Sequence, residues 1–145
     1  MNDASPPLQA DPLVLYGETF HSRLLLGTSR YPSPAVMEAA LRRAKPAMVT
    51  ASLRRQGAAT AEASNGFWEL LKKLGIPVLP NTAGCHSAQE VITTAQMARE
   101  VFETDWIKLE LIGDDYTLQP DTLNLVDVAS RLIKDGFKVD RKSVV

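Results

Sequence analysis

Short β-rich runs alternate with amphipathic segments along most of this chain, and this alternation limits the possible folds more than any other feature. The β-rich runs cover residues 24–28, 47–53, 77–82 and 106–112, and a helical pattern follows each. Repeated strand, helix, strand order predicts a parallel sheet with right-handed crossovers, because parallel neighbours need a long connection. The predicted fold class is therefore α/β.

Capping signals support the helical segments. Ser33 precedes Pro34 and an apolar stripe, which suits an N-cap followed by proline at the first helical position. Ser87 and Glu90 have the spacing of a capping box ahead of another apolar stripe. A helix is predicted to begin at each of these places.

Glycines mark the predicted ends of two helices. The fourth helix is expected to begin near Pro120 and to end at Gly136, just before a new strand. Gly75 lies in the same way between a helical segment and the run at residues 77–82. Glycine adopts the left-handed conformation of a C-terminal cap without steric cost, so both positions suit such caps.

The length of 145 residues fits one domain. Residues 1–12 are polar, contain three prolines and lack periodicity, so we expect a disordered lead-in before one domain over residues 13–145. Two architectures satisfy the order of elements: an open doubly wound sheet of about five strands, or the first half of a (β/α)8 TIM barrel. Length alone favours the open sheet, since complete barrels take about 250 residues.

Charge and cysteine content exclude several classes of function. The 16 basic and 17 acidic residues nearly cancel, which gives no general attraction to nucleic acid. The one cysteine, Cys85, allows no intramolecular disulfide or multi-cysteine metal site, and it fits a reducing cytosol. Neither a membrane span nor a signal peptide is recognisable. We expect a cytoplasmic protein without cofactor or metal, whose partners are small molecules or proteins.

The run at residues 106–112 carries the most informative polar side chains. Period two places Trp106, Lys108 and Glu110 on one face and the intervening aliphatic residues on the other. One wet face is ordinary in an antiparallel sheet, but parallel sheets usually have both faces covered. A buried, unprotonated lysine amine can attack a ketone and form an imine. Burial favours the neutral amine whereas an ionised neighbour opposes it, so Lys108 is the predicted catalytic residue and Glu110 a proton-transfer candidate.

Other polar residues near strand ends are weaker candidates. Asn81 and Thr82 follow the third β-rich run, where α/β proteins bind ligands, so they are predicted either to contact substrate or to form a tight turn. Cys85 and His86 lie beside a predicted helix start, which can make a thiol acidic, but an ordinary loop thiol is the favoured interpretation.

Two charged pairs complete the candidates. Arg54 and Arg55 follow the second β-rich run and could face a ligand. Asp114 and Asp115 lie in the loop after the fourth run, where a metal would need further ligands that the sequence does not provide. We expect the two aspartates to shape the loop.

Several short motifs resemble those of the thiazole synthase family, which builds the thiazole ring of thiamine. They occur in the family's order and spacing over roughly residues 14–139, and the third and fourth are the most specific. The motifs are Ser22-Arg-Leu-Leu-Leu-Gly-Thr28, Leu53-Arg-Arg55, Leu79-Pro-Asn-Thr-Ala-Gly84, Ile107-Lys-Leu-Glu110, Thr117-Leu118 with Pro120-Asp121, and Gly136-Phe137. The resemblance reverses the preference drawn from length and implies the first four to five strands of an incomplete (β/α)8 TIM barrel.

The resemblance also implies a reaction. In this family a strand lysine, here Lys108, forms a Schiff base with the ketone of 1-deoxy-D-xylulose 5-phosphate, and Glu110 matches an acid/base candidate. Sulfur comes from a small carrier protein with a C-terminal thiocarboxylate, and dehydroglycine supplies nitrogen and two carbons of the ring. The family also suggests a homo-oligomer.

The chain departs from the family pattern at two places. Ser29 and Arg30 replace a more usual glycine and lysine, which keeps the charge but loses the backbone freedom of glycine. After Val139 the family continues through a second half barrel with phosphate-binding glycine turns and a further acidic residue, whereas this chain ends at Val145. We expect a truncation or a shifted reading frame, and little or no synthase activity from the isolated chain.

Two alternative functions share these features. An imine-forming aldolase would use the same barrel and strand lysine, and dependence on the thiocarboxylate carrier separates it from a thiazole synthase. An inactive fragment that serves as a protein-interaction module is the alternative from a different class, because it needs only the surface that contacts a carrier or subunit.

Overall fold

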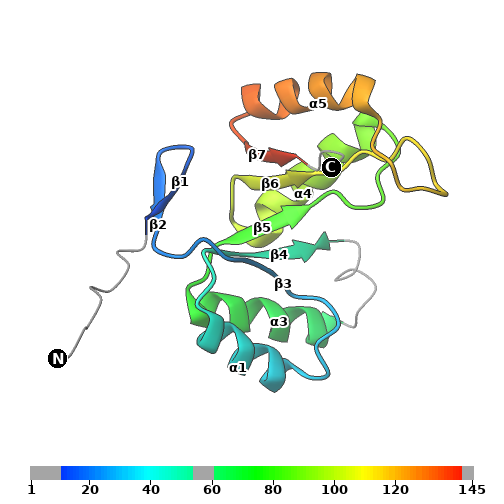
Figure 1. Cartoon of the computed structure of the whole chain (residues 1–145). Helices are drawn as coiled ribbons and strands as arrows, with labels where there is room; N and C mark the ends of the chain where they lie inside the picture. Colours follow the sequence, from blue (N-terminus) through cyan, green and yellow to red (C-terminus); the bar gives the residue numbers. More distant parts are fainter. Residues whose placement is uncertain (1–10, 54–60, 142–145) are drawn as a thin grey trace.

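A parallel sheet of five strands forms the centre of the molecule. The computed structural model describes residues 11–53 and 61–141, so the prediction for Arg54 and Arg55 lies outside the described residues, as do residues 1–10 of the expected lead-in. The strands follow one another in chain order across the sheet (Figure 1). They are β3 (Leu25–Gly27), β4 (Met48–Ser52), β5 (Val78–Asn81), β6 (Trp106–Leu109) and β7 (Lys138–Arg141).

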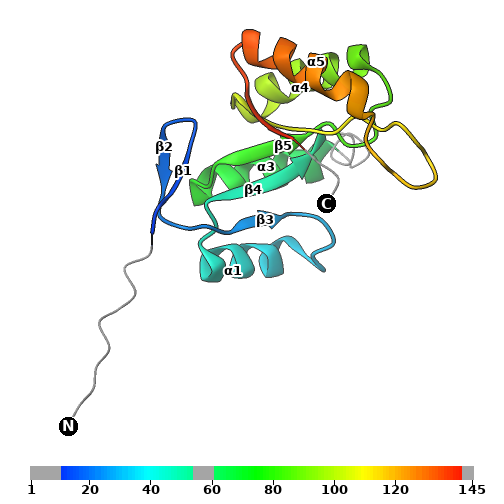
Figure 2. The same cartoon turned by 45° about the horizontal axis from the view of Figure 1, so that its top comes forward.

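Four helices within the described ranges pack on one face of this sheet. They are α1 (Pro34–Ala44), α3 (Ala61–Leu74), α4 (Ala88–Phe102) and α5 (Thr122–Lys134). Figures 1 and 2 show them on the outer side of the strands. Each contributes buried side chains to a single core cluster with strand residues of the same face, including Met37, Leu41, Val49, Leu71, Val91, Ala98, Ile107, Leu109, Val128 and Leu132.

This arrangement distinguishes between the two predicted architectures. A doubly wound sheet has helices on both faces and a point at which the strand order reverses. Here the order of the described strands is sequential and their helices share one side, as in a barrel. The partial (β/α)8 barrel is confirmed, and the open doubly wound alternative is wrong. None of the helices in the described ranges has the length and apolar character to cross a membrane.

The predicted helix ends agree with the structure. The Ser33 hydroxyl accepts a hydrogen bond from the Val36 N–H at 3.3 Å, and Pro34 is the first residue of α1. Ser87 and Glu90 form the reciprocal capping box of α4. Gly75 and Gly136 have φ of 64° and 87°, which is the left-handed conformation expected of C-terminal caps. The fourth predicted helix begins slightly later than expected, at Thr122, with Asp121 as its N-cap.

An antiparallel hairpin before the sheet was not predicted from the sequence. It pairs β1 (Leu13–Leu15) with β2 (Glu18–Phe20) through a two-residue turn. Both turn residues have positive φ, 49° at Tyr16 and 77° at Gly17, as a type I′ turn requires. Asn-Gly or Asp-Gly is the usual sequence signal for such a turn. Here tyrosine occupies the first turn position, so that signal is absent.

The hairpin covers the other face of the sheet at the N-terminal ends of the strands. Phe20 joins Met48, Leu79 and Trp106 in a second buried cluster, against which Leu13 and Leu15 also pack. Trp106 lies edge-on to both Tyr16 and Phe20. The apolar base of the partial barrel is therefore closed by the start of the chain.

Tyr16 also bonds the hairpin to the last strand of the sheet. Its hydroxyl donates to the Val139 carbonyl at 3.0 Å and accepts from the Val139 N–H at 3.1 Å. Lys138, next along β7, forms an ion pair with Glu18 of the hairpin. These contacts join residues at least 120 positions apart and hold β7 against the hairpin.

Replacing Tyr16 by phenylalanine is expected to lower the free energy of unfolding by about 1 kcal/mol, because two hydrogen bonds are lost while the ring is kept. Urea unfolding of the chain measures this change. Tyr116→Phe is the matched control, since Tyr116 is 97% exposed and its substitution should leave stability unchanged. Equal stability of the two variants would show that the Tyr16 hydroxyl does not stabilise the contact between the hairpin and β7.

Candidate active site

On the face away from the helices, side chains change from apolar to polar along the strands. In β4, Met48 lies in the second buried cluster, whereas Thr50 and Ser52 line a cavity further along the strand. The same order runs from Trp106 at the start of β6 to Glu110 just after its end. Because all five strands are parallel, the polar positions gather at their C-terminal ends, which is where barrel enzymes place their active sites.

A cavity of about 520 Å³ occupies this end of the sheet. This size suits a small-molecule ligand. Its walls carry hydroxyl, amide, carboxylate and guanidinium groups. The lining residues are Thr28, Ser29, Arg30, Thr50, Ser52, Asn81, Ala83 and Glu110. The cavity can therefore offer hydrogen bonds and both signs of charge to a polar molecule.

Lys108 points to the cavity side of the sheet. Its neighbours Ile107 and Leu109 are fully buried in the helix-side core, so the alternation predicted for this strand is confirmed. Lys108 is half-buried and pairs in register with Asn81, whose side chain lines the cavity, and on its other side with Asp140. Its amine forms no ion pair with any residue in the described part of the chain.

The cavity wall contains Asn81 and Glu110 on either side of Lys108, although Lys108 itself is not one of the lining residues. Asn81 is the register partner of Lys108, and Glu110 lies two positions after it on the same face. The structure thus brings together the three polar residues that the sequence singled out on this face.

Thr82 follows the last residue of β5, Asn81, and is fully buried. Its hydroxyl donates to the Glu110 carbonyl at 2.7 Å and accepts from the Glu110 N–H at 2.8 Å. Its own N–H donates to the Lys108 carbonyl at 3.1 Å. These contacts leave the side chain no surface for a ligand, so they do not support the expectation that Thr82 contacts substrate.

Hydroxyl residues of the cavity wall were missed by the sequence analysis. Thr50 and Ser52 of β4 line the cavity, as does Thr28 after β3, whose hydroxyl donates to the Thr50 carbonyl at 2.7 Å. Threonine and serine are common in strands, so they gave no separate signal. The shared parity of Thr50 and Ser52 near the end of β4 is the pattern that could have identified these two residues.

Arg30 stands at the edge of the cavity with a left-handed backbone, at φ 67°. Ser29, which replaces the family's usual glycine, does not have positive φ. The backbone freedom of glycine is therefore not required at position 29. The one residue of this pair in the left-handed region is Arg30, which supplies a positive charge to the cavity wall.

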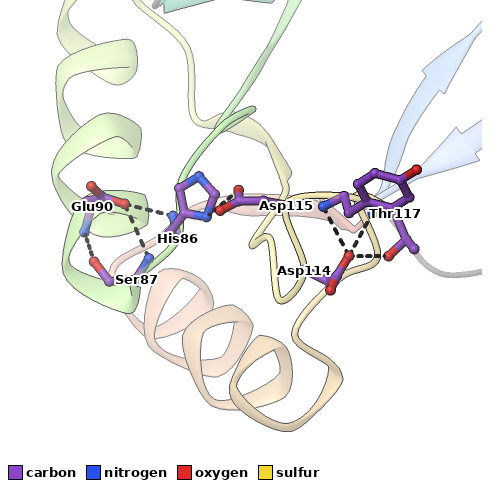
Figure 3. A network of polar contacts seen from close by, with 7 residues as sticks. His86, Ser87, Glu90, Asp114, Asp115 and Thr117 are labelled. Carbon is purple, nitrogen blue, oxygen red and sulfur yellow. Dashed lines mark hydrogen bonds and ion pairs between the residues drawn. The ribbon is translucent and has the colours of Figure 1, made fainter.

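A network of polar contacts joins the loops that follow β5 and β6 (Figure 3). The His86 Nδ1 lies 3.4 Å from the Asp115 Oδ1 and so connects the loops that follow β5 and β6. Asp114 accepts hydrogen bonds from the Thr117 N–H, the Thr117 hydroxyl and the Tyr116 N–H, and these hold the pKa of its carboxyl below the ordinary value. The loop-forming role expected of the two aspartates is consistent with these contacts.

Cys85 lies in the loop between β5 and α4, and its side chain belongs to the core. It is fully buried in the helix-side cluster, and its Sγ lies 3.5 Å from the Thr94 hydroxyl of α4. Within residues 11–53 and 61–141, no group of three histidine, cysteine or acidic side chains is placed to hold a metal ion.

Comparison with known proteins relates this arrangement to one family. The family model described as "Thiazole biosynthesis protein ThiG" matches residues 14–141, which is most of the chain. The matched region includes all of the hairpin except Leu13, the five-stranded sheet and every residue of the cavity wall.

Curated relatives are similar over nearly the whole chain. The thiazole synthase of Variovorax paradoxus is 74% identical over 141 residues, which are 96% of this chain and 52% of the relative. The thiazole synthase of Paracidovorax citrulli is 78% identical over 129 residues, which are 89% of this chain and 48% of the relative. That of Cupriavidus pinatubonensis is 72% identical over 130 residues. The chain spans about half the length of the curated relatives it matches.

Proposed function

Because this chain belongs to the ThiG family of thiazole biosynthesis proteins, we propose that it carries the imine-forming part of a thiazole synthase. The product would be the thiazole phosphate moiety of thiamine. The reactants would be 1-deoxy-D-xylulose 5-phosphate, dehydroglycine and a sulfur-carrier protein that ends in a thiocarboxylate. Lys108 is the residue proposed to react with the ketose.

In the first step of this proposal, the neutral Lys108 amine adds to the ketone carbon of the sugar phosphate. A carbon–nitrogen bond forms, the carbonyl oxygen leaves as water, and the resulting imine withdraws electrons from the neighbouring carbon. Loss of a proton from that carbon gives an enaminol, and return of a proton to the former imine carbon leaves an amine there and a carbonyl one position along the sugar. Glu110 is proposed as the group that transfers this proton, because it lies on the same face two positions further along.

The observation that carries the proposal is the placement of Lys108. A lysine with a half-buried side chain points from a parallel strand toward the open face of a partial barrel, in register with a cavity residue, Asn81. Parallel strands normally carry apolar side chains on a covered face. Met48 and Leu79 do so on this face, at the end of the sheet that the hairpin covers. Asn81 is proposed to hydrogen-bond the hydroxyl groups of the sugar.

A chimeric enzyme tests this function. The segment of the Variovorax paradoxus thiazole synthase that aligns with this chain would be replaced by the chain's own residues. The resulting chimera has the full length of the relative. With all three reactants present, mass spectrometry is expected to detect thiazole phosphate, and omission of the thiocarboxylate carrier should abolish it. The parent enzyme serves as the control for assay conditions.

The outcomes separate the competing functions. A chimera that cleaves the ketose phosphate without the carrier would be an aldolase. A chimera that binds the carrier yet forms neither product nor a borohydride-reducible imine would be an interaction module. Either result contradicts a synthase role for this part of the chain.

A further inference from the structure

Strands β5 and β6 pair in register at a single position, which lies where the candidate site begins. Asn81 and Lys108 are the register partners of the two strands. One residue further along the chain, the Thr82 side chain makes hydrogen bonds to the backbone of Glu110. Its hydroxyl contacts both the N–H and the carbonyl of Glu110, at 2.8 Å and 2.7 Å.

The chemistry of the hydroxyl explains why threonine suits this position. A hydroxyl offers a donor and an acceptor, which together match the exposed N–H and carbonyl of one residue. A buried backbone group without a partner is unfavourable, and Thr82 is fully buried. A side chain without a hydroxyl would leave both backbone groups of Glu110 without this partner.

We infer that Thr82 is a positioning residue that fixes the Glu110 backbone, and hence the direction of the Glu110 carboxyl group relative to Lys108. Thr82 touches both residues, because its N–H also bonds the Lys108 carbonyl at 3.1 Å. This inference rests on the proposed function, in which Lys108 forms the imine and Glu110 moves the proton. Proton transfer requires the acid or base within hydrogen-bond reach, so a displaced carboxyl group slows the chemical step.

The opposite end of the same two strands supplies a matched control. The Thr104 hydroxyl donates to the Val78 carbonyl at 3.2 Å and accepts from the Trp106 N–H at 3.2 Å. It thus bridges β5 and β6 with the same chemistry as Thr82, but at the end of the sheet that the hairpin covers. Thr104→Val removes such a bridge without touching Glu110.

The test compares Thr82→Val, Thr82→Ser and Thr104→Val in the chimeric enzyme. Thr82→Val is expected to lower kcat by about 100-fold with KM changed less than about threefold, since a misplaced catalytic group affects the reaction more than binding. Thr82→Ser keeps the hydroxyl and should restore kcat to within about fivefold of the unsubstituted chimera. Thr104→Val should lower the melting temperature but retain kcat.

Three results would overturn the inference. They are a normal kcat in Thr82→Val, a loss in Thr104→Val as large as that in Thr82→Val, or a folded Thr82→Ser as inactive as the valine variant. If Thr82→Val does not fold, Thr82→Cys takes its place in the test, and its weaker donor and acceptor should give a kcat well below that of Thr82→Ser. Absence of any reducible imine in the unsubstituted chimera would instead refute the proposed function, and the role of Thr82 with it.

Discussion

Replacing Lys108 by arginine in the chimeric enzyme is expected to lower turnover by on the order of 10³-fold or more, a loss typical of removing the group that forms a covalent intermediate. Arginine keeps the positive charge and most of the length, but its guanidinium stays protonated and does not form an imine. The half-buried position on β6 accommodates a long polar side chain, so the fold should persist. Turnover and borohydride-trapped adduct, measured on the same preparations, report this loss.

Lys134→Arg is the control for this substitution. Lys134 lies in the last turn of α5 on the outer side of the sheet and is exposed. The same change there should leave turnover within about twofold of the parent, because surface substitutions seldom matter. Full turnover in Lys108→Arg would exclude a catalytic imine at this residue. It would mean that the reaction needs only the positive charge of Lys108.

The second large effect concerns the helix-side core. Leu132→Ala is expected to lower the free energy of unfolding of the chain by about 2–5 kcal/mol, because it removes buried methyl groups and leaves a cavity. Leu132 is fully buried where α5 packs against the sheet. Urea denaturation measures the change.

The same helix provides the control. Leu123 is 88% exposed near the start of α5, so Leu123→Ala should change stability by no more than about 0.5 kcal/mol. Similar losses in both variants would mean that α5 does not pack on the sheet by the face described. A difference of several kcal/mol supports the one-sided arrangement of helices on which the barrel assignment depends.

Much of the fold could be predicted from local patterns. The capping box at Ser87 and Glu90 and the glycines after two helices act within a few residues, so the sequence displays them directly. The alternation of Ile107 and Leu109 with Lys108 likewise depends only on strand geometry. Local patterns do not reveal on which side of the sheet each helix packs, and so the doubly wound alternative stayed open until the strand order was known.

The candidate site was predictable only in part. Lys108 and Glu110 stood out because charges are unusual in a covered parallel strand. The bonding of Thr82 to Glu110 joins residues 28 positions apart and depends on where β5 and β6 separate, which no local pattern encodes. The hairpin was missed because Tyr16 hides the usual sequence signal of its turn, and because the bonds of Tyr16 to Val139 join residues 123 positions apart.

Peptide mapping of the reduced adduct tests Lys108 without any substitution. The chimeric enzyme would be incubated with 1-deoxy-D-xylulose 5-phosphate, treated with borohydride, digested and analysed by tandem mass spectrometry. The expected result is one modified lysine, at Lys108, with a mass increase that corresponds to the sugar phosphate joined through a secondary amine. A reduced adduct on another lysine with Lys108 unmodified, or no adduct in an enzyme that turns over, would contradict the proposed chemistry.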